Sequence, residues 1–268
     1  MSDLPGLDNR LTAEMRSAGV LVVTISQPRR RNALSLAMWR GLADIFAHAG
    51  LARDIRAVVL AGDGGHFCSG ADISEFDELR DSAKSAAFYD AENDRAVEAI
   101  RRCPKPVIAA MSGCAVGGGL SVALACDVRV ADATLTAGIP AARLGVLYSI
   151  VDCRLLYHRL GATAAKEILF SGRLFGVEDA VRLRLVDRVA EAGQSALEAG
   201  LAFASEIAAG APLSVQGHKA IVDACDAGEL ESRRPELEAR IAAAFDSADY
   251  KEGRRAFAER REPVFKGE

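Results

Sequence analysis

Two glycine-rich stretches contain the residues best suited to chemistry. The stretch 117–119 (GGG) follows an apolar run at 106–111, and the stretch 63–73 (DGGHFCSGADI) follows an apolar run at 57–62. Glycine has no Cβ, and the first N–H groups of a helix have no partner within it, so a ligand oxygen can approach those groups closely. Each stretch predicts a turn that leads from a buried strand into a helix, and the two turns could face one another.

The glycines do not match the common nucleotide-binding patterns. No Lys-Ser or Lys-Thr pair follows 117–119, which excludes the phosphate-binding loop, and the spacing differs from the dinucleotide fingerprint. A lone GGG also suits a close strand-to-helix packing turn that binds no ligand, and this alternative stays open.

Taken together, the two stretches resemble the loops of the crotonase superfamily, also called the enoyl-CoA hydratase/isomerase family. Its members carry an FxxGAD-type loop and a GxxxGGG loop at about this separation, here Phe67–Asp72 and the loop that ends at Gly119. The resemblance implies that the N–H groups of Ala71 and Gly118 form an oxyanion hole for a CoA thioester carbonyl. Such donors stabilise the charge of a thioester enolate.

The acid–base groups of the similar hydratases are missing. In those enzymes one glutamate follows the third glycine by two residues and another follows the proline of a GxPE loop; here these places hold Ser121 and Ala141. Neither side chain can act as a carboxylate base. The sequence therefore predicts an acyl-CoA enzyme, a lyase or isomerase, whose ordinary hydratase activity is weak or absent. The alternative is a non-catalytic acyl-CoA-binding protein.

A third alternative centres on Tyr148. The segment 142–148 is similar to the methylmalonyl-CoA decarboxylase branch, which has a tyrosine at this place, although that branch has a histidine in place of Ala71 and a glutamate in place of Ser121. Loss of carbon dioxide itself generates an enolate, so a decarboxylase or other lyase using Tyr148 needs no strong base. Tyr148 also suits a packing role under the acyl pocket. Fast hydration would point to another proton-transferring group, such as Tyr148 or Asp152.

The resemblance also implies contacts to the CoA moiety. The residues concerned are Arg29, Arg31, Ala33, Ser69, Asp72, Ile73 and Lys266. Guanidinium groups suit phosphate oxygens. From charge alone, the arginines also fit a solvated turn, and Lys266 also fits a charged tail.

The pattern of elements predicts an α/β fold with a helical end. Apolar segments at 11–15 and 19–26 predict a strand hairpin, and Ser35 is placed to cap a helix that runs to about Gly50. The repeated strand, strand, helix units fit the ββα spiral of the crotonase family better than a doubly wound sheet. From about Gln194 the pattern is helical. We expect a spiral core at 1–193 and a helical subdomain at 194–268, which in the family builds a trimer or a dimer of trimers.

Composition excludes several partners. The 268 residues have a formal net charge of −4, without the basic surface that nucleic acid requires, and no apolar run has the length of a membrane span. Residues 1–9 lack the pattern of a signal peptide, so we expect a cytoplasmic protein. The six cysteines are isolated, which favours reduced thiols over disulfides or a metal site. No motif implies a metal, nicotinamide or flavin, and CoA would arrive as part of a substrate in fatty acid or branched acyl-CoA metabolism.

Overall fold

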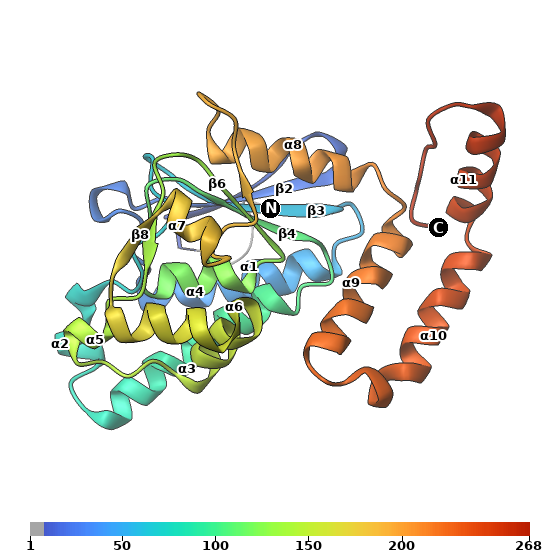
Figure 1. Ribbon diagram of the computed structural model, residues 1–268. Coiled ribbons are helices and arrows are strands. Elements are labelled where there is room, and N and C mark those ends of the chain that lie inside the picture. The colour runs from blue at the N-terminus through green and yellow to red at the C-terminus, as the bar shows by residue number, and fades with distance from the viewer. Residues whose placement is uncertain (1–7) are drawn as a thin grey trace.

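The computed structural model describes residues 8–268, and over that range the main sheet has six strands (Figure 1). In sheet order they are β1 (Leu11–Met15), β2 (Val20–Ile25), β3 (Ala57–Gly62), β4 (Val107–Met111), β6 (Val128–Ala131) and β9 (Arg188–Val189). β1 is antiparallel to β2, and all other neighbours are parallel. The expectation of no signal peptide rests mainly on residues 1–7, which lie outside the described residues.

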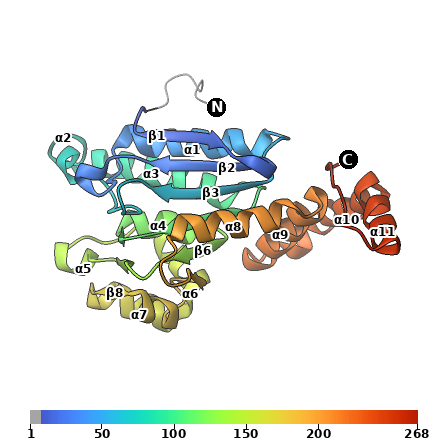
Figure 2. The same cartoon turned by 90° about the horizontal axis from the view of Figure 1, so that it is seen from above.

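Helices cover both faces of this sheet, which explains why its central strands are apolar throughout. α8 (Ala196–Ala208) lies on one face, where its alanines pack with Val59 of β3. The preceding residue, Val58, points to the opposite face and joins the larger core cluster with α1 (Leu36–Leu51) and α3 (Ala83–Arg101). Figure 2 shows α8 along the sheet, on the side away from α1 and α3. The alternation of side chains along β3 thus builds two cores.

A second, three-stranded sheet lies beside the first within the described range. Its strands in order are β5 (Cys114–Val116), β7 (Thr136–Gly138) and β8 (Leu174–Gly176). The helices around it are α2 (Phe76–Leu79), α4 (Gly118–Ala125), α5 (Ala141–Leu144), α6 (Ile150–Ser171) and α7 (Val177–Arg182). α4 is buried at every residue after its first, in agreement with its small and apolar composition.

Three helices project from the sheet as an arm (Figures 1 and 2). They are α9 (Pro212–Asp226), α10 (Leu230–Asp246) and α11 (Ala248–Glu259), and residues 212–268 are called the C-terminal arm below. Arg56 ties the arm to the sheet: its guanidinium donates to the carbonyl of Ala208 at 3.0 Å and to that of Phe265 at 2.5 Å. Across residues 8–268, no helix combines the length and the apolar character needed to span a bilayer.

Most predicted elements are confirmed. The hairpin, the helix capped by Ser35, the strand at 57–62 and the four C-terminal helices all form. The short strands β5 and β8 and the length of α6 were not predicted. The boundary after residue 193 stays a prediction, and the structure adds that α8 packs on the sheet, so the helices that leave the sheet begin with α9.

Candidate functional site

Adjacent parallel strands bring the two glycine-rich loops together. β3 and β4 are neighbours, so both loops leave the same edge of the sheet, where ligands bind in open α/β sheets. The Cys68 N–H donates to the Cys114 carbonyl at 2.9 Å, and the Val116 N–H donates to the Cys68 carbonyl at 2.9 Å. These two hydrogen bonds hold the loop after β3 against β5, directly before the three glycines.

The glycines are required by the backbone at this contact. Gly117, which precedes α4, has a φ of 60°, a conformation that L side chains rarely adopt. A Cβ built on Gly119 would lie 2.2 Å from the carbonyl oxygen of Cys68, well inside van der Waals contact. Glycine at these positions therefore allows the start of α4 to approach the other loop.

The N–H groups of Ala71 and Gly118 are placed as neighbours. The Leu34 N–H donates to the Gly70 carbonyl at 2.7 Å and the Asp72 N–H donates to the Leu34 carbonyl at 2.8 Å, so the Ala71 N–H between them points away from Leu34. Gly118 is the first residue of α4, and a Cβ built on it would lie 3.8 Å from the Ala71 nitrogen. Neither N–H donates to another residue within 8–268. The loops thus offer two adjacent donors.

These donors line a cavity of about 160 Å³. The lining also includes charged side chains, namely Arg80 directly after α2, Asp90 and Asp94 of α3, and Asp152 of α6. Leu147, which lines the cavity too, is 94% exposed. The cavity therefore combines backbone donors, charged side chains and an exposed apolar residue.

Tyr148 reaches the same glycines. Its hydroxyl oxygen lies 3.2 Å from the position that a Cβ on Gly117 would occupy. Burial, with the charge of Asp152 in second place, raises the pKa of the Tyr148 hydroxyl above its ordinary value, so the group keeps its proton at neutral pH. Among the residues that the structure describes, none accepts a hydrogen bond from this hydroxyl. It remains available as a donor into the cavity.

Asp152 is the carboxyl group whose surroundings are most unusual. It lies in the first turn of α6, and its Oδ1 atom is buried without a hydrogen-bond partner among residues 8–268. Its Oδ2 atom faces the hydroxyl of Ser149 at 3.3 Å, and that hydroxyl also lies 2.9 Å from Oδ1 of Asp94 on α3. Burial raises the pKa of Asp152 to about 6, although the hydroxyl of Ser121 acts in the opposite direction.

The structure brings together some of the predicted site residues. Five of them line the cavity of about 160 Å³, which is called the narrow cavity below: Ser69, Ala71, Ile73, Gly118 and Tyr148. Ala141 also lines it, and Ser121 is buried in α4 near Asp152. The predicted catalytic group of Ala71, Gly118 and Tyr148 therefore shares one cavity, while its roles stay predictions.

Other predicted residues lie outside the cavity lining, namely Arg29, Arg31, Ala33, Asp72 and Lys266. Asp72 is bound by Arg30, whose Nη1 lies 2.5 Å from Oδ1. Burial opposes ionisation of Asp72, but hydrogen bonds from Ser74 and Arg30 hold its pKa below the usual range. Lys266 belongs to the arm, where its N–H donates to Asp249 at 2.7 Å. Figure 1 shows the C-terminus on the arm, across the molecule from α5. Within a single chain, Lys266 therefore does not lie near Ala71.

Sequence reasoning named Asp152 only as an alternative proton-transferring group beside Tyr148, and assigned no role to Asp90 or Asp94 of α3. The available signal was the pattern Ser149-x-x-Asp152 ahead of an apolar stretch, which marks a helix start and so points the aspartate back toward the preceding loop. Ser149 does cap α6, since its hydroxyl accepts from the Asp152 N–H at 3.1 Å. Only the fold shows that Asp90 and Asp94 of α3 line the same cavity as Asp152.

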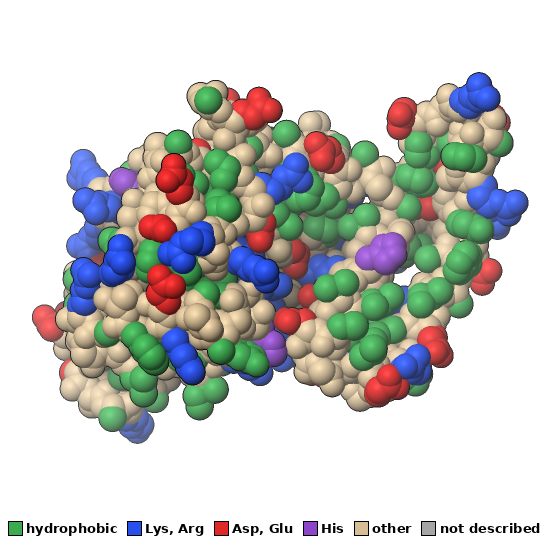
Figure 3. All heavy atoms as spheres, in the orientation of Figure 1, with side chains coloured by type: hydrophobic (Ala, Val, Ile, Leu, Met, Phe, Trp, Pro, Cys, Tyr) green, Lys and Arg blue, Asp and Glu red, His purple; other side chains and the backbone are tan. Residues whose placement is uncertain are grey.

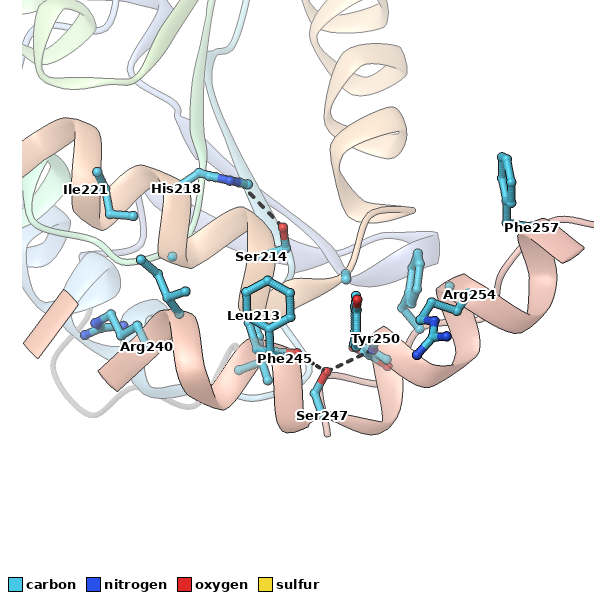
Figure 4. A pocket seen from close by; sticks show the side chains of 17 residues that line it. Leu213, Ser214, His218, Ile221, Arg240, Phe245, Ser247, Tyr250, Arg254 and Phe257 are labelled. Carbon is cyan, nitrogen blue, oxygen red and sulfur yellow. Dashed lines mark hydrogen bonds between the residues drawn. The ribbon is translucent and has the colours of Figure 1, made fainter. Parts of the chain in front are cut away.

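A second and larger cavity lies in the C-terminal arm. This groove, of about 620 Å³, is lined by side chains of α9, α10 and α11, and Figure 4 shows Leu213, Phe245 and Tyr250 among them. Hydrophobic side chains gather along the arm on the face drawn in Figure 3. Phe257, which also lines the groove, is 87% exposed. We call this feature the arm groove.

Comparisons with known proteins agree along nearly the whole chain. The family described as enoyl-CoA hydratase/isomerase matches residues 15–268. A putative enoyl-CoA hydratase of Thermus thermophilus is 35% identical over 257 residues, which cover 94% of this chain and 99% of that protein. An (E)-benzylidenesuccinyl-CoA hydratase of Thauera aromatica is 32% identical, covering 92% and 96%. The crystal structure of an enoyl-CoA hydratase/carnithine racemase from Magnetospirillum magneticum covers 97% of both chains with a TM-score of 0.88 and 38% identity. This structural match confirms the predicted fold class.

Proposed function

The chain belongs to the enoyl-CoA hydratase/isomerase family, and from this premise we propose that its narrow cavity binds the thioester end of an acyl-CoA. The N–H groups of Ala71 and Gly118 donate hydrogen bonds to the thioester oxygen as it gains the charge of an enolate. The observation that carries this proposal is the adjacency of these two N–H groups, neither of which donates to another residue within 8–268. One such donor typically contributes about 3 kcal/mol to lowering the barrier.

We propose that this protein is a lyase or isomerase in which rapid hydration of the usual kind is weak or absent. Ordinary hydration needs one group to activate water and another to protonate the carbon next to the carbonyl. The family places for these groups hold Ser121 in α4 and Ala141 in α5, neither of which ionises as a carboxylate. A non-catalytic acyl-CoA-binding protein is the alternative that these two residues also fit.

A decarboxylase or related lyase is a second candidate, favoured by the position of Tyr148. Its hydroxyl lies against Gly117, beside the proposed oxyanion hole, and burial keeps it protonated. A donor at this point could stabilise the enolate that forms when carbon dioxide leaves. Replacement of Tyr148 by Phe removes that donor, and unchanged turnover of a malonyl-type thioester would exclude this candidate.

We propose that the nucleotide end of CoA contacts the residues predicted to bind the CoA moiety. Arg29 and Arg31 are exposed, so their guanidinium groups are accessible to phosphate. Asp72 is engaged by Arg30, which favours a role in shaping the loop over a direct contact. Lys266 stays a proposed CoA contact, as do Ala33, Ser69 and Ile73.

A homotrimer, or a dimer of trimers, stays the proposed assembly, and a cytoplasmic location stays a prediction. The arm groove supports the assembly because its large apolar side chains, such as Phe257, are exposed in a single chain. A second copy of this chain is the proposed occupant of the groove.

The test compares two ligands on the purified full-length protein. Butyryl-CoA has a thioester carbonyl, and the thioether S-butyl-CoA lacks that oxygen but is otherwise matched. Calorimetry should give a dissociation constant at least tenfold lower for butyryl-CoA, because two donors then have an acceptor. Hydration of crotonyl-CoA in the same buffer should stay near background.

Each outcome has a separate meaning. Equal affinity for the two ligands would contradict the proposed oxyanion hole, and no binding of either would contradict the acyl-CoA site altogether. Rapid hydration of crotonyl-CoA would show that groups other than Ser121 and Ala141 supply proton transfer.

A further inference from the structure

One oxygen of the Asp152 carboxylate is buried without a structural explanation in the described part of the fold. Its Oδ1 atom has no hydrogen-bond partner among residues 8–268, yet it lines the cavity that Ala71 and Gly118 also line. A buried polar atom without a partner is costly, and such atoms in native proteins commonly have a catalytic or ligand-binding reason. The cavity that Asp152 shares with the backbone donors suggests that reason.

We propose that Asp152 is a catalytic residue that takes a proton from the carbon next to the thioester carbonyl and returns one to it. This inference rests on the proposed acyl-CoA site. It assigns the acid–base work to α6, from which Asp152 approaches Ser121, the residue on α4 that occupies the place of a family glutamate. A carboxyl group is thus supplied to the same region from a neighbouring helix.

The proton transfer is balanced without any further reactant. Oδ1 of the Asp152 carboxylate takes the proton, and the electron pair of the broken C–H bond becomes the enolate, whose oxygen accepts hydrogen bonds from Ala71 and Gly118. The neutral carboxylic acid then gives a proton back to the same carbon. Because the acid exchanges its proton with water between these steps, deuterium from D₂O enters the acyl chain.

Ser149 is the positioning residue for this group. Its single hydroxyl proton faces two carboxylates, Asp94 at 2.9 Å and Asp152 at 3.3 Å, and it can be donated to one of them at a time. Donation to Asp94 withdraws the Ser149 proton from Asp152 and favours the protonated form of Asp152, whereas donation to Asp152 favours its carboxylate. The hydroxyl thus connects the charge of α3 to the protonation of Asp152.

Several charged groups face Asp152 and set the pH range of the reaction. Asp90 and Asp94 of α3 oppose its ionisation, as does burial, which contributes most to a pKa of about 6. Arg80 and Tyr148 line the same cavity, and Cys153 follows Asp152 in the chain; Tyr148 and Cys153 have raised pKa values and stay protonated at neutral pH. Since the carboxylate is the base, deuterium exchange should rise through about pH 6 and level off above it.

The experiment measures deuterium incorporation into butyryl-CoA in D₂O by mass spectrometry. The proteins compared are the unmodified chain, Asp152→Asn and the control Glu167→Gln, which changes a half-buried carboxylate on the same helix that pairs with Arg182 and does not line the cavity. We expect exchange with the unmodified chain and with the control, and a loss of at least about 100-fold in Asp152→Asn. The dissociation constant of butyryl-CoA should change less than about threefold, because the thioester oxygen is held by backbone.

The outcomes separate this inference from the proposed function. Exchange by Asp152→Asn at the rate of the unmodified chain would overturn the role of Asp152. Binding of butyryl-CoA without exchange by the unmodified chain would also overturn it while leaving the acyl-CoA site intact, whereas absence of binding would overturn both. Ser149→Ala should move the midpoint of the pH profile upward, and a purely structural Ser149 would leave that midpoint in place.

Discussion

The narrow cavity beside the glycine-rich loops is smaller than the arm groove, and it is the more polar of the two. The groove is the larger, about 620 Å³ against about 160 Å³, and is lined mainly by apolar side chains. The narrow cavity contains buried polar atoms without partners in the described part of the chain, on Asn93 and Asp152. The volume of a cavity thus shows how much surface needs covering, while unpartnered polar atoms show where a ligand is oriented.

The largest expected effect on stability comes from replacing a glycine by alanine beside the narrow cavity. The same replacement beside the arm groove serves as the comparison. Gly119→Ala should lower the free energy of unfolding by about 3 kcal/mol, because the new Cβ meets the Cys68 carbonyl. Gly217→Ala, in α9 beside the arm groove, has open space and should raise it by about 0.5–1 kcal/mol. Urea unfolding measures both, and a Gly119→Ala variant as stable as the unmodified chain would contradict the close contact between the loops.

A second prediction concerns the cost of the polar cavity to the fold. The pKa of Asp152 is raised to about 6, so the folded state binds its proton more tightly than the unfolded state, and stability is lost as the pH rises from about 4 to about 6. Asp152→Asn removes this loss. It should be more stable by about 2 kcal/mol at pH 8 and indistinguishable at pH 4, as measured by urea unfolding at both values.

The control for this prediction is Glu167→Gln on the same helix, whose carboxylate is half-buried and pairs with Arg182 outside the narrow cavity. That variant should show no such dependence on pH. An Asp152→Asn variant less stable than the unmodified chain at pH 8 would mean that the carboxylate makes favourable contacts in the fold.

The arm groove gives a prediction about assembly. Phe257 is 87% exposed in a single chain, so Phe257→Ser should change the stability of an isolated chain by less than about 0.5 kcal/mol. If a second copy covers the groove, the same change should weaken assembly by about 2 kcal/mol and lower the mass measured by sedimentation. Leu51→Ser alters a side chain of similar exposure on α1 and serves as the control.

The smallest effects come from a matched pair of helix caps. Ser149 caps α6 at the narrow cavity, and Ser247 caps α11 at the arm groove, each by accepting an N–H hydrogen bond. Replacement of either by Ala should cost about 1 kcal/mol of stability. Only Ser149→Ala should also raise the pKa of Asp152, because the Ser149 hydroxyl helps to lower it. Carboxyl NMR titration distinguishes the two.

Sequence patterns predicted the fold well where they are local. The runs at 57–62 and 107–111 are apolar throughout, as buried parallel strands require, and Ser35 has the side chain that an N-cap needs. The adjacency of Ala71 and Gly118 was expected from the family resemblance, and the close approach of the two loops agrees with it.

The rest of the site depends on contacts between distant parts of the chain. Asp94 and Ser149 are 55 residues apart, and no periodicity in either segment indicates that they share a hydrogen bond. The charges that oppose ionisation of Asp152 likewise come from Asp90 and Asp94 of α3, an earlier part of the sequence that packs against α4. The environment of a carboxyl group on a neighbouring helix therefore cannot be predicted from motif positions alone.

The hydrogen bond between Arg56 and Phe265 of the arm has a consequence for biosynthesis. Arg56 lies directly before β3, and its partner Phe265 leaves the ribosome 209 residues later. Domains fold progressively as they emerge, so the central strands can assemble long before this carbonyl is available. The orientation of the arm is thus fixed among the last steps of synthesis, and a nascent chain presents its finished sheet before its apolar groove.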